Sequence, residues 1–302
     1  MMRRIRIAVC VIFVASCAIF GVYMYQTRMV EDHTPPVISL EEDVITVSVD
    51  AEDAEILKGV TALDDKDGDI TGSVRISSMS HFIEKGKRYV TYIVFDQANQ
   101  AGTAQRTLVY TDYHSPRIYL KDPLRFSLNE VSSGNPSLDL TAEDCLDGDI
   151  TNQVRTTFDT NYYDMLPGDY SVTVQVSNSA GDVCSIPLKM TLVDPSDREE
   201  SRKLYPMLED YIVYTAVGES LDLNAYVTGM MRGSQAYSME EAQLYLNVGT
   251  EDLEISSNVN YEQPGVYTVE YSCTAGGTQG DEGTTETDAV TAVTRLYVVV
   301  EE

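Results

Sequence analysis

Hydrophobic and polar residues follow two different patterns along this chain. Residues 7–25 form one stretch of about 19 residues without a charge, whereas the chain from about residue 32 onwards alternates apolar and polar positions in short segments. Such alternation puts every second side chain on one face, as in half-buried β-strands. Clusters of Gly, Pro, Asn and Asp separate the segments at roughly 8–12 residue intervals, which is typical of all-β sandwiches. The pattern predicts one apolar helix followed by β domains.

The uncharged stretch has the length of a membrane-spanning helix. At about 1.5 Å rise per residue it covers roughly the 30 Å hydrocarbon core of a bilayer. Arg3, Arg4 and Arg6 precede it, while Glu31 and Asp32 follow it. The positive-inside rule then keeps the N-terminus in the cytoplasm and exports the rest of the chain. Residues 1–28 are therefore predicted to be a cytoplasmic tip and a single-pass membrane anchor.

Two other fates of this stretch stay open. A cleavable signal usually has an apolar core of about 7–15 residues followed by an A-x-A site, and this stretch is longer and has no such site. Residues 14–17, Val-Ala-Ser-Cys, are similar to a lipobox, which would be cut and lipidated at Cys17, but the chain stays apolar up to Tyr25. The uncleaved anchor is favoured, and all three fates place the later residues outside the cytoplasm.

The exported portion contains an internal duplication, the sign of a repeat protein. Three pairs of segments match: residues 32–40 with 112–120, residues 67–74 with 147–154, and residues 86–96 with 168–178. A weaker third copy follows, in which residues 221–225 and 264–269 echo 138–142 and 167–172, and a Met-rich stretch (229–239) replaces the Asp-Gly-Asp-Ile-Thr element. A short helix is expected near residues 238–246. The predicted domains are Ig-like domain 1 (32–112), Ig-like domain 2 (113–194), a polar linker (195–203) and a divergent Ig-like domain 3 (204–302).

The order of motifs resembles a known family. D-x-x-x-P-x-I-x-L, then T-A-x-D-x-x-DGDIT, then G-x-Y-x-V-x-Y-x-x-x-D-x-A-G-N is similar to the bacterial immunoglobulin-like repeat of the pesticidal-crystal-protein type, over roughly residues 32–194. Arg88 stands where that motif has Tyr, and Asn99-Gln100 stands for Gly-Asn. The resemblance implies tandem immunoglobulin-like β-sandwiches, an extracellular spacer or adhesion role and no enzyme activity, although a fold shared this widely does not fix function.

Charge narrows the possible partners. The formal net charge is −27, and the four arginines of the first 28 residues leave about −31 on the remainder. A surface this acidic repels phosphate backbones, so nucleic acid is excluded as a partner. The membrane is expected as a partner only through the N-terminal helix. A solvated, secreted surface is the simplest interpretation of the acidity.

Acidic loops in the first two repeats raise the question of calcium, which binds six to eight oxygen ligands. The candidate ligands are Asp64, Asp65, Asp67 and Asp69 in repeat one and Asp144, Asp147 and Asp149 in repeat two. Neither loop has the order of an EF-hand. The same residues suit a turn, in which carboxylates accept from backbone amides and Gly68 or Gly148 supplies positive φ. The turn is favoured, no cofactor is expected, and calcium stays the alternative.

Two cysteines of the second repeat suggest a disulfide. Cys145 and Cys184 stand where repeat one has Asp65 and Gly102. In an immunoglobulin-like topology their loops lie at the same end of the sandwich, so the pair can oxidise outside the cell. Two separate thiols are the alternative. Cys273, at an inward strand position, is expected to be a buried thiol.

Catalytic signatures are not found in the sequence. It has only three His and no G-x-S-x-G, H-E-x-x-H or phosphate-binding loop, so no catalytic residue is predicted. We expect a non-enzymatic cell-surface protein in which the first two domains form a stalk and the third is an adhesion or ligand-binding head for an extracellular protein or polysaccharide. Its loops at residues 229–239 and 276–283 would carry recognition. A carbohydrate- or wall-processing enzyme or its accessory module, and a structural assembly subunit, are the alternatives.

Overall fold

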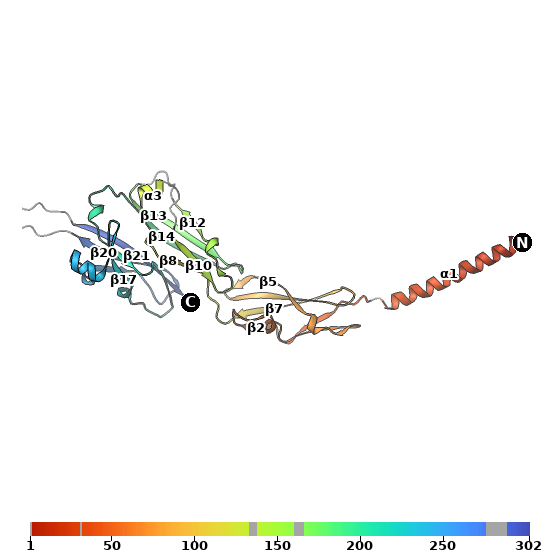
Figure 1. The fold of residues 1–302 in the computed structure, drawn as a ribbon. Helices are drawn as coiled ribbons and strands as arrows, with labels where there is room; N and C mark the ends of the chain where they lie inside the picture. Colours follow the sequence, from red (N-terminus) through yellow and green to blue (C-terminus); the bar gives the residue numbers. More distant parts are fainter. Residues whose placement is uncertain (1, 31, 133–137, 160–165, 276–288) are drawn as a thin grey trace, which may run out of the picture. The chain divides into compact units, whose positions relative to one another are not determined.

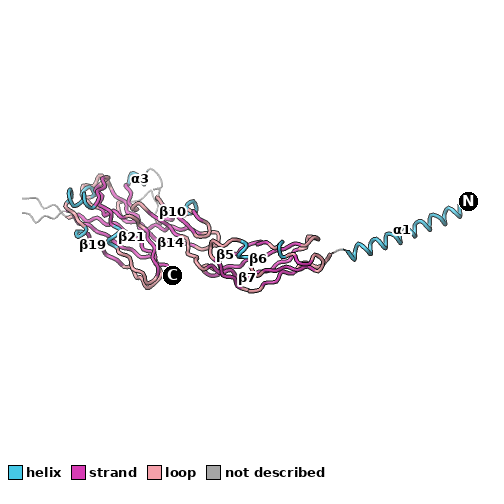
Figure 2. Tube along the Cα trace, turned by 60° about the horizontal axis from the view of Figure 1, so that its bottom comes forward, coloured by secondary structure: helices cyan, strands magenta, loops and turns pink. Residues whose placement is uncertain are grey.

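The computed structural model describes residues 2–30, 32–132, 138–159, 166–275 and 289–302, and the chain divides into two compact units, Met1–Tyr113 and His114–Glu302. The first unit contains helix α1 (Met2–Val30) and one β-sandwich, and the second contains two β-sandwiches (Figures 1 and 2). The expected fold class, immunoglobulin-like β-sandwiches in tandem after one N-terminal apolar helix, is confirmed. The three bodies are called sandwich 1 (residues 37–110), sandwich 2 (117–193) and sandwich 3 (205–301).

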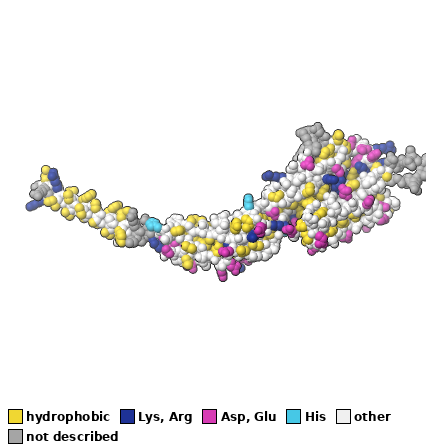
Figure 3. All heavy atoms as spheres, turned by 180° about the vertical axis from the view of Figure 1, so that it is seen from behind, with side chains coloured by type: hydrophobic (Ala, Val, Ile, Leu, Met, Phe, Trp, Pro, Cys, Tyr) yellow, Lys and Arg dark blue, Asp and Glu magenta, His cyan; other side chains and the backbone are white. Residues whose placement is uncertain are grey.

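Helix α1 is apolar over a length that suits a bilayer. Its segment Arg4–Gln26 spans 23 residues with a mean hydropathy of 2.5, and none of it is buried against the described protein. Figure 3 shows hydrophobic side chains along the helix. By length and composition it is the one described helix able to cross a membrane, as the sequence pattern predicted.

Each sandwich has the same arrangement of strands, a three-stranded sheet and a four-stranded sheet. In sandwich 1 the three-stranded sheet has the order β1 (Val37–Leu40), β3 (Val60–Asp64), β4 (Gly68–Asp69). The four-stranded sheet has the order β2 (Val44–Val47), β7 (Ala101–Tyr110), β6 (Lys87–Phe95), β5 (Arg75–Glu84). In sandwich 2 the three-stranded sheet has the order β11 (Gly148–Asp149), β10 (Leu140–Asp144), β8 (Arg117–Leu120). The four-stranded sheet has the order β12 (Arg155–Phe158), β13 (Gly168–Ser177), β14 (Val183–Val193), β9 (Arg125–Ser127). In sandwich 3 the three-stranded sheet has the order β15 (Tyr205–Leu208), β17 (Val227–Arg232), β18 (Gln235–Ser238). The four-stranded sheet has the order β16 (Ile212–Ala216), β21 (Val290–Glu301), β20 (Gly265–Ala275), β19 (Leu253–Ser257).

The edge of each four-stranded sheet is a parallel pair: β2 with β7, β9 with β14, and β16 with β21. All other strand pairs described are antiparallel. Sandwich 3 therefore repeats the topology of the other two, although its sequence has diverged.

Period-two alternation placed the core residues correctly. Val90, Tyr92 and Val94 of β6 each have an exposed fraction of at most 1%, and the corresponding residues of β13 and β20 are also buried. Side chains on the other face of these strands are more exposed, as expected for a sheet with one face in the core. Burying a Val or Leu side chain contributes about 1.5–3 kcal/mol, so these rows are the main stabilising term of each sandwich.

Among the residues that the structure describes, the helical segments other than α1 are short. They are α2 (Asp53–Ile56), η1 (Thr71–Ser73), α3 (Leu128–Ser132), η2 (Thr151–Gln153), η4 (Glu200–Arg202), η5 (Leu223–Tyr226), α4 (Met239–Glu241), η6 (Ala242–Leu246) and η7 (Thr250–Asp252). The short helix expected near residues 238–246 is present as α4 and η6. It begins with a capping box in which Ser238 and Glu241 bond each other's backbone amides.

Sandwiches 2 and 3 share one hydrophobic core, which the sequence did not predict. The cluster joins Ile118, Leu120 and Leu188 of sandwich 2 to Ile212 and Leu296 of sandwich 3. The polar stretch 195–203 connects the two sandwiches along the chain, but their strands pack directly against each other. The second unit is consequently one body made of two sandwiches.

Hydrogen bonds fix the register between these two sandwiches. Tyr214 Oη accepts from the Ile118 amide at 2.7 Å and donates to its carbonyl at 2.9 Å, and the Tyr211 amide donates to Leu120 O at 2.9 Å. The Lys189 amide donates to Tyr297 Oη at 2.6 Å. Tyrosines are suited to this position because the ring is apolar while the hydroxyl satisfies a backbone group.

Ion pairs surround the same contact. Arg295 Nη2 lies 2.6 Å from Asp169 Oδ2, and Arg117 Nη2 lies 2.6 Å from Glu301 Oε2. The Arg125 guanidinium stacks on the Tyr205 ring at 3.6 Å from its centroid. Each of these contacts crosses from sandwich 2 to sandwich 3, so the interface is specific as well as apolar.

Candidate functional site

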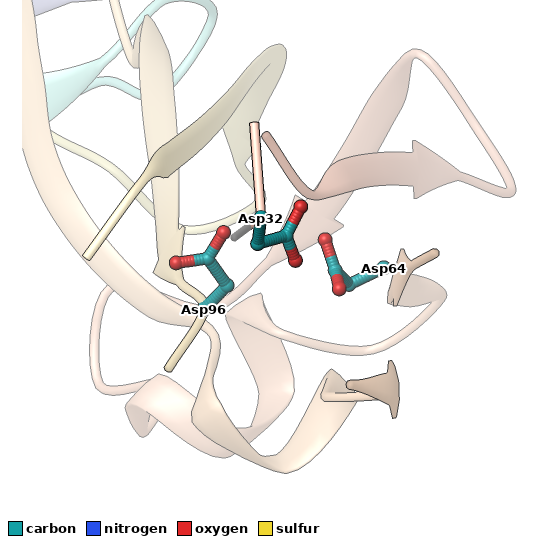
Figure 4. A group of neighbouring side chains, drawn as sticks. All are labelled: Asp32, Asp64 and Asp96. Carbon is teal, nitrogen blue, oxygen red and sulfur yellow. The ribbon is translucent and has the colours of Figure 1, made fainter. Parts of the chain in front are cut away.

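Three carboxylates meet in sandwich 1. Asp32 lies in the segment before β1, Asp64 is the last residue of β3, and Asp96 follows β6 directly. One carboxylate oxygen of each lies within 4.8 Å of those of the other two. Figure 4 shows the three carboxyl groups turned towards one another. Three segments far apart in sequence therefore place their acids at one end of the sandwich.

Asp64 carries the least satisfied atom of this group. Its side chain is 92% buried, since only 8% of the residue is exposed. Its Oδ1 accepts from the amides of Lys66 and Asp67, each at 2.8 Å. Its Oδ2 is buried and has no hydrogen-bond partner among the described residues. A buried carboxylate oxygen without a donor costs free energy unless a cation or a proton reaches it.

Asp96 and Asp32 are held by their own neighbours. Asp96 is 6% exposed, and it accepts from the Gln100 amide at 2.7 Å and from Gln100 Nε2 at 3.1 Å. Asp32 Oδ1 accepts from the amide and the hydroxyl of Thr34. The bond from the Thr34 amide is the main cause that lowers the pKa of Asp32, and the positive charge of Lys66 adds to it. All three acids are thereby held in position.

The other acids predicted in this loop lie elsewhere. Asp67 Oδ2 accepts from the Gln97 amide at 2.7 Å, and Asp69 Oδ1 accepts from the Thr71 amide at 3.0 Å. Gly68 between them has φ +73°, the left-handed conformation that glycine adopts easily. Asp65 is exposed. Of the four acids proposed as calcium ligands in repeat one, the structure places only Asp64 in the cluster, and Asp67 and Asp69 act on the backbone as the turn interpretation expects.

Sandwich 2 repeats this loop with one decisive difference. Asp144 Oδ1 accepts from the amides of Leu146 and Asp147 at 2.9 and 3.1 Å, as Asp64 does in sandwich 1. Its Oδ2, however, accepts from Asn178 Nδ2 at 3.0 Å. Asn178 occupies the position of Asp96, so the second repeat has an amide donor where the first has a carboxylate.

The remaining acids of the second repeat are also engaged in turns. Asp147 accepts from the amide and the hydroxyl of Ser179 at 2.6 and 2.7 Å, and Asp149 accepts from the Thr151 amide at 2.9 Å. Gly148 has φ +70°. Asp112, the counterpart of Asp32, bonds Ser48 Oγ at 2.6 Å and the Val49 amide at 2.8 Å in the first unit. No group of three acids of the kind in sandwich 1 occurs elsewhere in the described residues.

Asp32 and Asp96 were not among the predicted ligands. Both belong to the duplicated segments, and both occupy aspartate positions of the motif that resembles the bacterial repeat. The change from Asp96 to Asn178 at matching positions was the available signal. It could not be interpreted before the fold showed that the start of β1 and the ends of β3 and β6 lie together.

Cys145 and Cys184 are not joined in a disulfide in the structure. Cys145 Sγ lies 3.2 Å from the His114 carbonyl oxygen. Cys184 is half-buried where its thiol contacts Tyr214 of sandwich 3, and burial raises the pKa of the thiol to about 11. Packing of sandwich 3 on β14 thus gives Cys184 a second neighbour that the sequence did not reveal. Cys273 is buried, as expected.

The regions expected to carry recognition in sandwich 3 have a different character. Residues 229–239 form most of the β17–β18 hairpin and lead into α4, and Met230 is fully buried. Gly229 is required there, because a Cβ would lie 2.1 Å from the Tyr237 carbonyl oxygen. The stretch 276–283 lies outside the described residues. Part of the Met-rich stretch is therefore core rather than recognition loop.

Sandwich 1 also has a polar pocket of about 260 Å³, and none of the three aspartates lines it. It is lined by Glu41, Glu42 and Glu55 together with Lys58 and Arg106. Arg106 is 4% exposed and donates to the Ile56 and Lys58 carbonyls, so its charge is committed to the backbone. The volume is below the roughly 300–1,000 Å³ of usual small-molecule sites.

No family model matches the chain, and no curated protein matches it. Among solved structures it is similar to CBM51-2 in complex with GlcNAc and INT domains from Clostridium perfringens ZmpB, with 20% identity and a TM-score of 0.21 over 50% of this chain and 26% of that one. It is also similar to the lipoprotein BT2262 from Bacteroides thetaiotaomicron, with 14% identity and a TM-score of 0.19 over 51% of this chain and all of that one. Human CDH23 EC21-23 gives 10% identity and a TM-score of 0.20 over 88% and 100%. The chain spans about a quarter of the ZmpB chain, and these likenesses concern the β-sandwich fold alone.

Proposed function

We propose that this chain is a single-pass membrane protein that presents a non-catalytic binding module outside the cell. The observation that carries the proposal is the uncovered apolar surface of α1. A 23-residue helix segment with mean hydropathy 2.5 has no described protein surface packed on it. In water such a surface is unfavourable at about 25 cal/mol per Å², and a bilayer is the solvent that matches its length.

Charge supports the orientation. Arg4 and Arg6 flank the N-terminal end of the apolar segment, and acidic residues follow the helix, so the basic end belongs on the cytoplasmic side. The strongly acidic sandwiches are then exported. A strongly negative net charge keeps such domains in solution, and it reduces their non-specific binding to anionic headgroups.

The shared core of sandwiches 2 and 3 refines the division of roles. A binding head works best when its recognition surfaces are held rigidly, because fewer degrees of freedom are lost on binding. Sandwich 3 alone was expected to be this head. We now assign the head to the whole second unit, residues 114–302, and the spacer role to sandwich 1. An extracellular protein or a polysaccharide is the expected partner class.

A non-catalytic role agrees with how the polar groups are used. Arg295, Arg117 and Arg125 bind acids or aromatic rings between sandwiches, and Asp67 and Asp147 bind backbone amides. These contacts stabilise the fold and leave those side chains committed.

The test uses the full-length protein in lipid nanodiscs, applied to a glycan array and to extracts of surface proteins and wall polysaccharides. We expect saturable retention of one partner, lost when surface loops of the second unit are altered and retained when those of sandwich 1 are altered. Release of reducing ends or of peptide fragments from the same polysaccharides or proteins, at a rate proportional to protein concentration, would favour the enzyme alternative instead.

A further inference from the structure

We propose that sandwich 1 binds one divalent cation of the calcium type through Asp32, Asp64 and Asp96, and that sandwich 2 has lost the equivalent site. The proposal concerns the first unit, and only the affinity expected for it rests on the extracellular location proposed above. It follows from the burial of these acids, from one unsatisfied oxygen and from the comparison between the repeats.

The first step is the charge of the group. Asp64 and Asp96 are both more than nine-tenths buried, and their ligand atoms lie within 4.8 Å of each other and of Asp32. Carboxylates brought this close repel, and burial strengthens the repulsion because the local dielectric constant falls. An arrangement of this kind is stable when a cation compensates the charge.

The second step is the orphaned oxygen. Oδ1 of Asp64 is satisfied by two backbone amides, which fixes the rotation of the carboxylate. Its Oδ2 is buried and has no donor among the described residues. Native proteins rarely leave a buried polar atom in this condition, and a bound cation is one of the few physical reasons for it.

The second repeat supports the proposal by comparison. Asp96 and Asn178 lie in equivalent turns of the two repeats, because the Asp96 amide donates to the Gln100 carbonyl at 3.2 Å and the Asn178 amide donates to the Asp182 carbonyl at 3.1 Å. Their Oδ1 atoms accept from the amides of the same residues at 2.7 and 2.9 Å. The remaining side-chain atom is an oxygen in Asp96 and an NH₂ group in Asn178.

This one atom decides how the neighbouring acid is satisfied. In sandwich 2 the Asn178 amide donates to Asp144 Oδ2, so that carboxylate needs no ion. In sandwich 1 the corresponding atom is Asp96 Oδ2, which accepts from Gln100 Nε2 at 3.1 Å and, being an oxygen, cannot donate to Asp64 Oδ2. The counterpart of Asp32 is also committed elsewhere, because Asp112 bonds Ser48 and Val49. The two repeats therefore differ at two of the three positions, in the direction that removes a cation site.

The ligand chemistry favours calcium. All three groups are carboxylates, the hard oxygen ligands that Ca²⁺ binds at about 2.3–2.6 Å with variable geometry, whereas Mg²⁺ demands a near-ideal octahedron. Carboxylates contributed by three separate segments suit the variable geometry better. Sites of extracellular modules bind Ca²⁺ with dissociation constants on the order of 10⁻⁴–10⁻³ M, and we expect this range.

The position of Asp32 gives the ion a structural role. Asp32 follows the end of α1 at Val30 by two residues, while Asp64 and Asp96 end strands of the sandwich. An ion bound by all three ties the segment that leaves the helix to β3 and β6. The close packing of this segment agrees with that role, since Pro36 O lies only 2.1 Å from where a Cβ of Gly102 would be.

Lys66 offers a competing explanation. Its charge acts on Asp32, so an ammonium group already compensates part of the negative charge. This explanation predicts a cluster that is satisfied without a metal, and direct measurement of calcium binding separates it from the proposal.

The experiment is a calcium titration of the full-length protein in detergent micelles after treatment with EDTA, by calorimetry and by thermal melting, with magnesium as a parallel arm. Asp96→Asn is the informative variant because sandwich 2 shows that an amide is accommodated at this position. Asp65→Asn is the matched control, because Asp65 is an exposed acid of the same loop outside the cluster. Lys66→Met tests the ammonium explanation.

We expect one calcium ion per chain, a calcium-dependent rise in the melting temperature of sandwich 1, and tighter binding of calcium than of magnesium. Asp96→Asn should weaken binding by roughly tenfold or more, since loss of even an outer partner of a metal site costs about 10–100-fold. Asp65→Asn should bind as the wild type does, and Lys66→Met should bind at least as tightly.

The proposal is overturned by any of three results. They are the absence of saturable calcium binding up to 10 mM (about tenfold above the expected range), an equal effect of Asp65→Asn and Asp96→Asn, and a stabilising effect of Asp96→Asn with no calcium response in the wild type. If neither the wild type nor Lys66→Met binds calcium, masking of the site by the lysine is excluded.

Discussion

Asn178 donates a hydrogen bond from Nδ2 to Asp144 Oδ2 across 3.0 Å, inside sandwich 2. Both residues are more than nine-tenths buried. The pair lies where sandwich 1 has two carboxylates, so it shows how the same loop is stabilised without a cation. It also defines the first test of the account.

Asn178→Asp should destabilise the second unit at pH 7 by about 1–3 kcal/mol, because the hydrogen bond is replaced by two facing carboxylates. Urea unfolding of the variant and the wild type measures the difference. An unchanged midpoint at pH 7 would show that the amide is not required.

Gly102→Ala should destabilise sandwich 1 by about 1–3 kcal/mol, because the added Cβ would meet the Pro36 carbonyl oxygen at 2.1 Å and force the entering segment away. Gly72→Ala is the matched control, since a Cβ there has nothing within 4 Å and its backbone is not left-handed. Thermal melting of the two variants gives the comparison. Equal melting temperatures would contradict the close approach of this segment.

Tyr214→Phe tests the joint body of sandwiches 2 and 3. The change removes the acceptor for the Ile118 amide and the donor for its carbonyl, and should cost about 1–3 kcal/mol. Tyr245→Phe, at an exposed tyrosine, should cost almost nothing. Denaturant unfolding should show residues 114–302 melting in one transition that the variant shifts as a whole. Two separate transitions, of which only one moves, would contradict a common core.

The inward faces of single strands could be predicted from the sequence, but the contact between sandwiches could not. Alternation fixed Val90, Tyr92 and Val94 because one face of β6 is in the core and the other is not. In β21 the consecutive residues Leu296, Tyr297 and Val298 are all buried. A strand covered on both faces loses alternation, and this run of apolar residues was the only sign in the sequence that a second body packs on it.

The acidic site shows the same limit. The sequence identified Asp64 and the turn role of the Asp-Gly-Asp elements, because turn chemistry is local. Asp32 and Asp96 each lie 32 residues from Asp64 along the chain. Only the pairing of β1 with β3, and the packing of the two sheets, bring these three positions together. Cys184 shows the limit too, since its contact with Tyr214 of sandwich 3 could not be seen in the sequence.

Acid should weaken the contact between sandwiches 2 and 3 through Asp169. Burial raises the pKa of this carboxyl, but bonds from Thr191 and Arg295 outweigh it, and the pKa lies below its ordinary value of 3.8. A lowered pKa in the folded state means that the stabilisation is complete above about pH 4–5 and is lost as the pH falls through the folded pKa. Because the pair is partly exposed, the contribution is about 0.2–1 kcal/mol.

Asp169→Asn is the variant that isolates this effect. Unfolding of the second unit, followed between pH 6 and pH 3, should be less sensitive to pH in Asp169→Asn than in the wild type. Asp159→Asn serves as a control for general loss of negative charge. A variant that keeps the full acid dependence of the wild type would show that other carboxylates dominate it.

Membrane topology is the measurement that tests the central claim most directly. The protein is expressed with one epitope before Met1 and another after Glu302, and proteinase K is added to intact cells. The account predicts that the protein fractionates with membranes, that the C-terminal epitope is lost on digestion, and that the N-terminal epitope survives on a fragment about the size of α1. Recovery of a soluble protein that begins near residue 18–30, or protection of the C-terminal epitope until the cells are lysed, would contradict it.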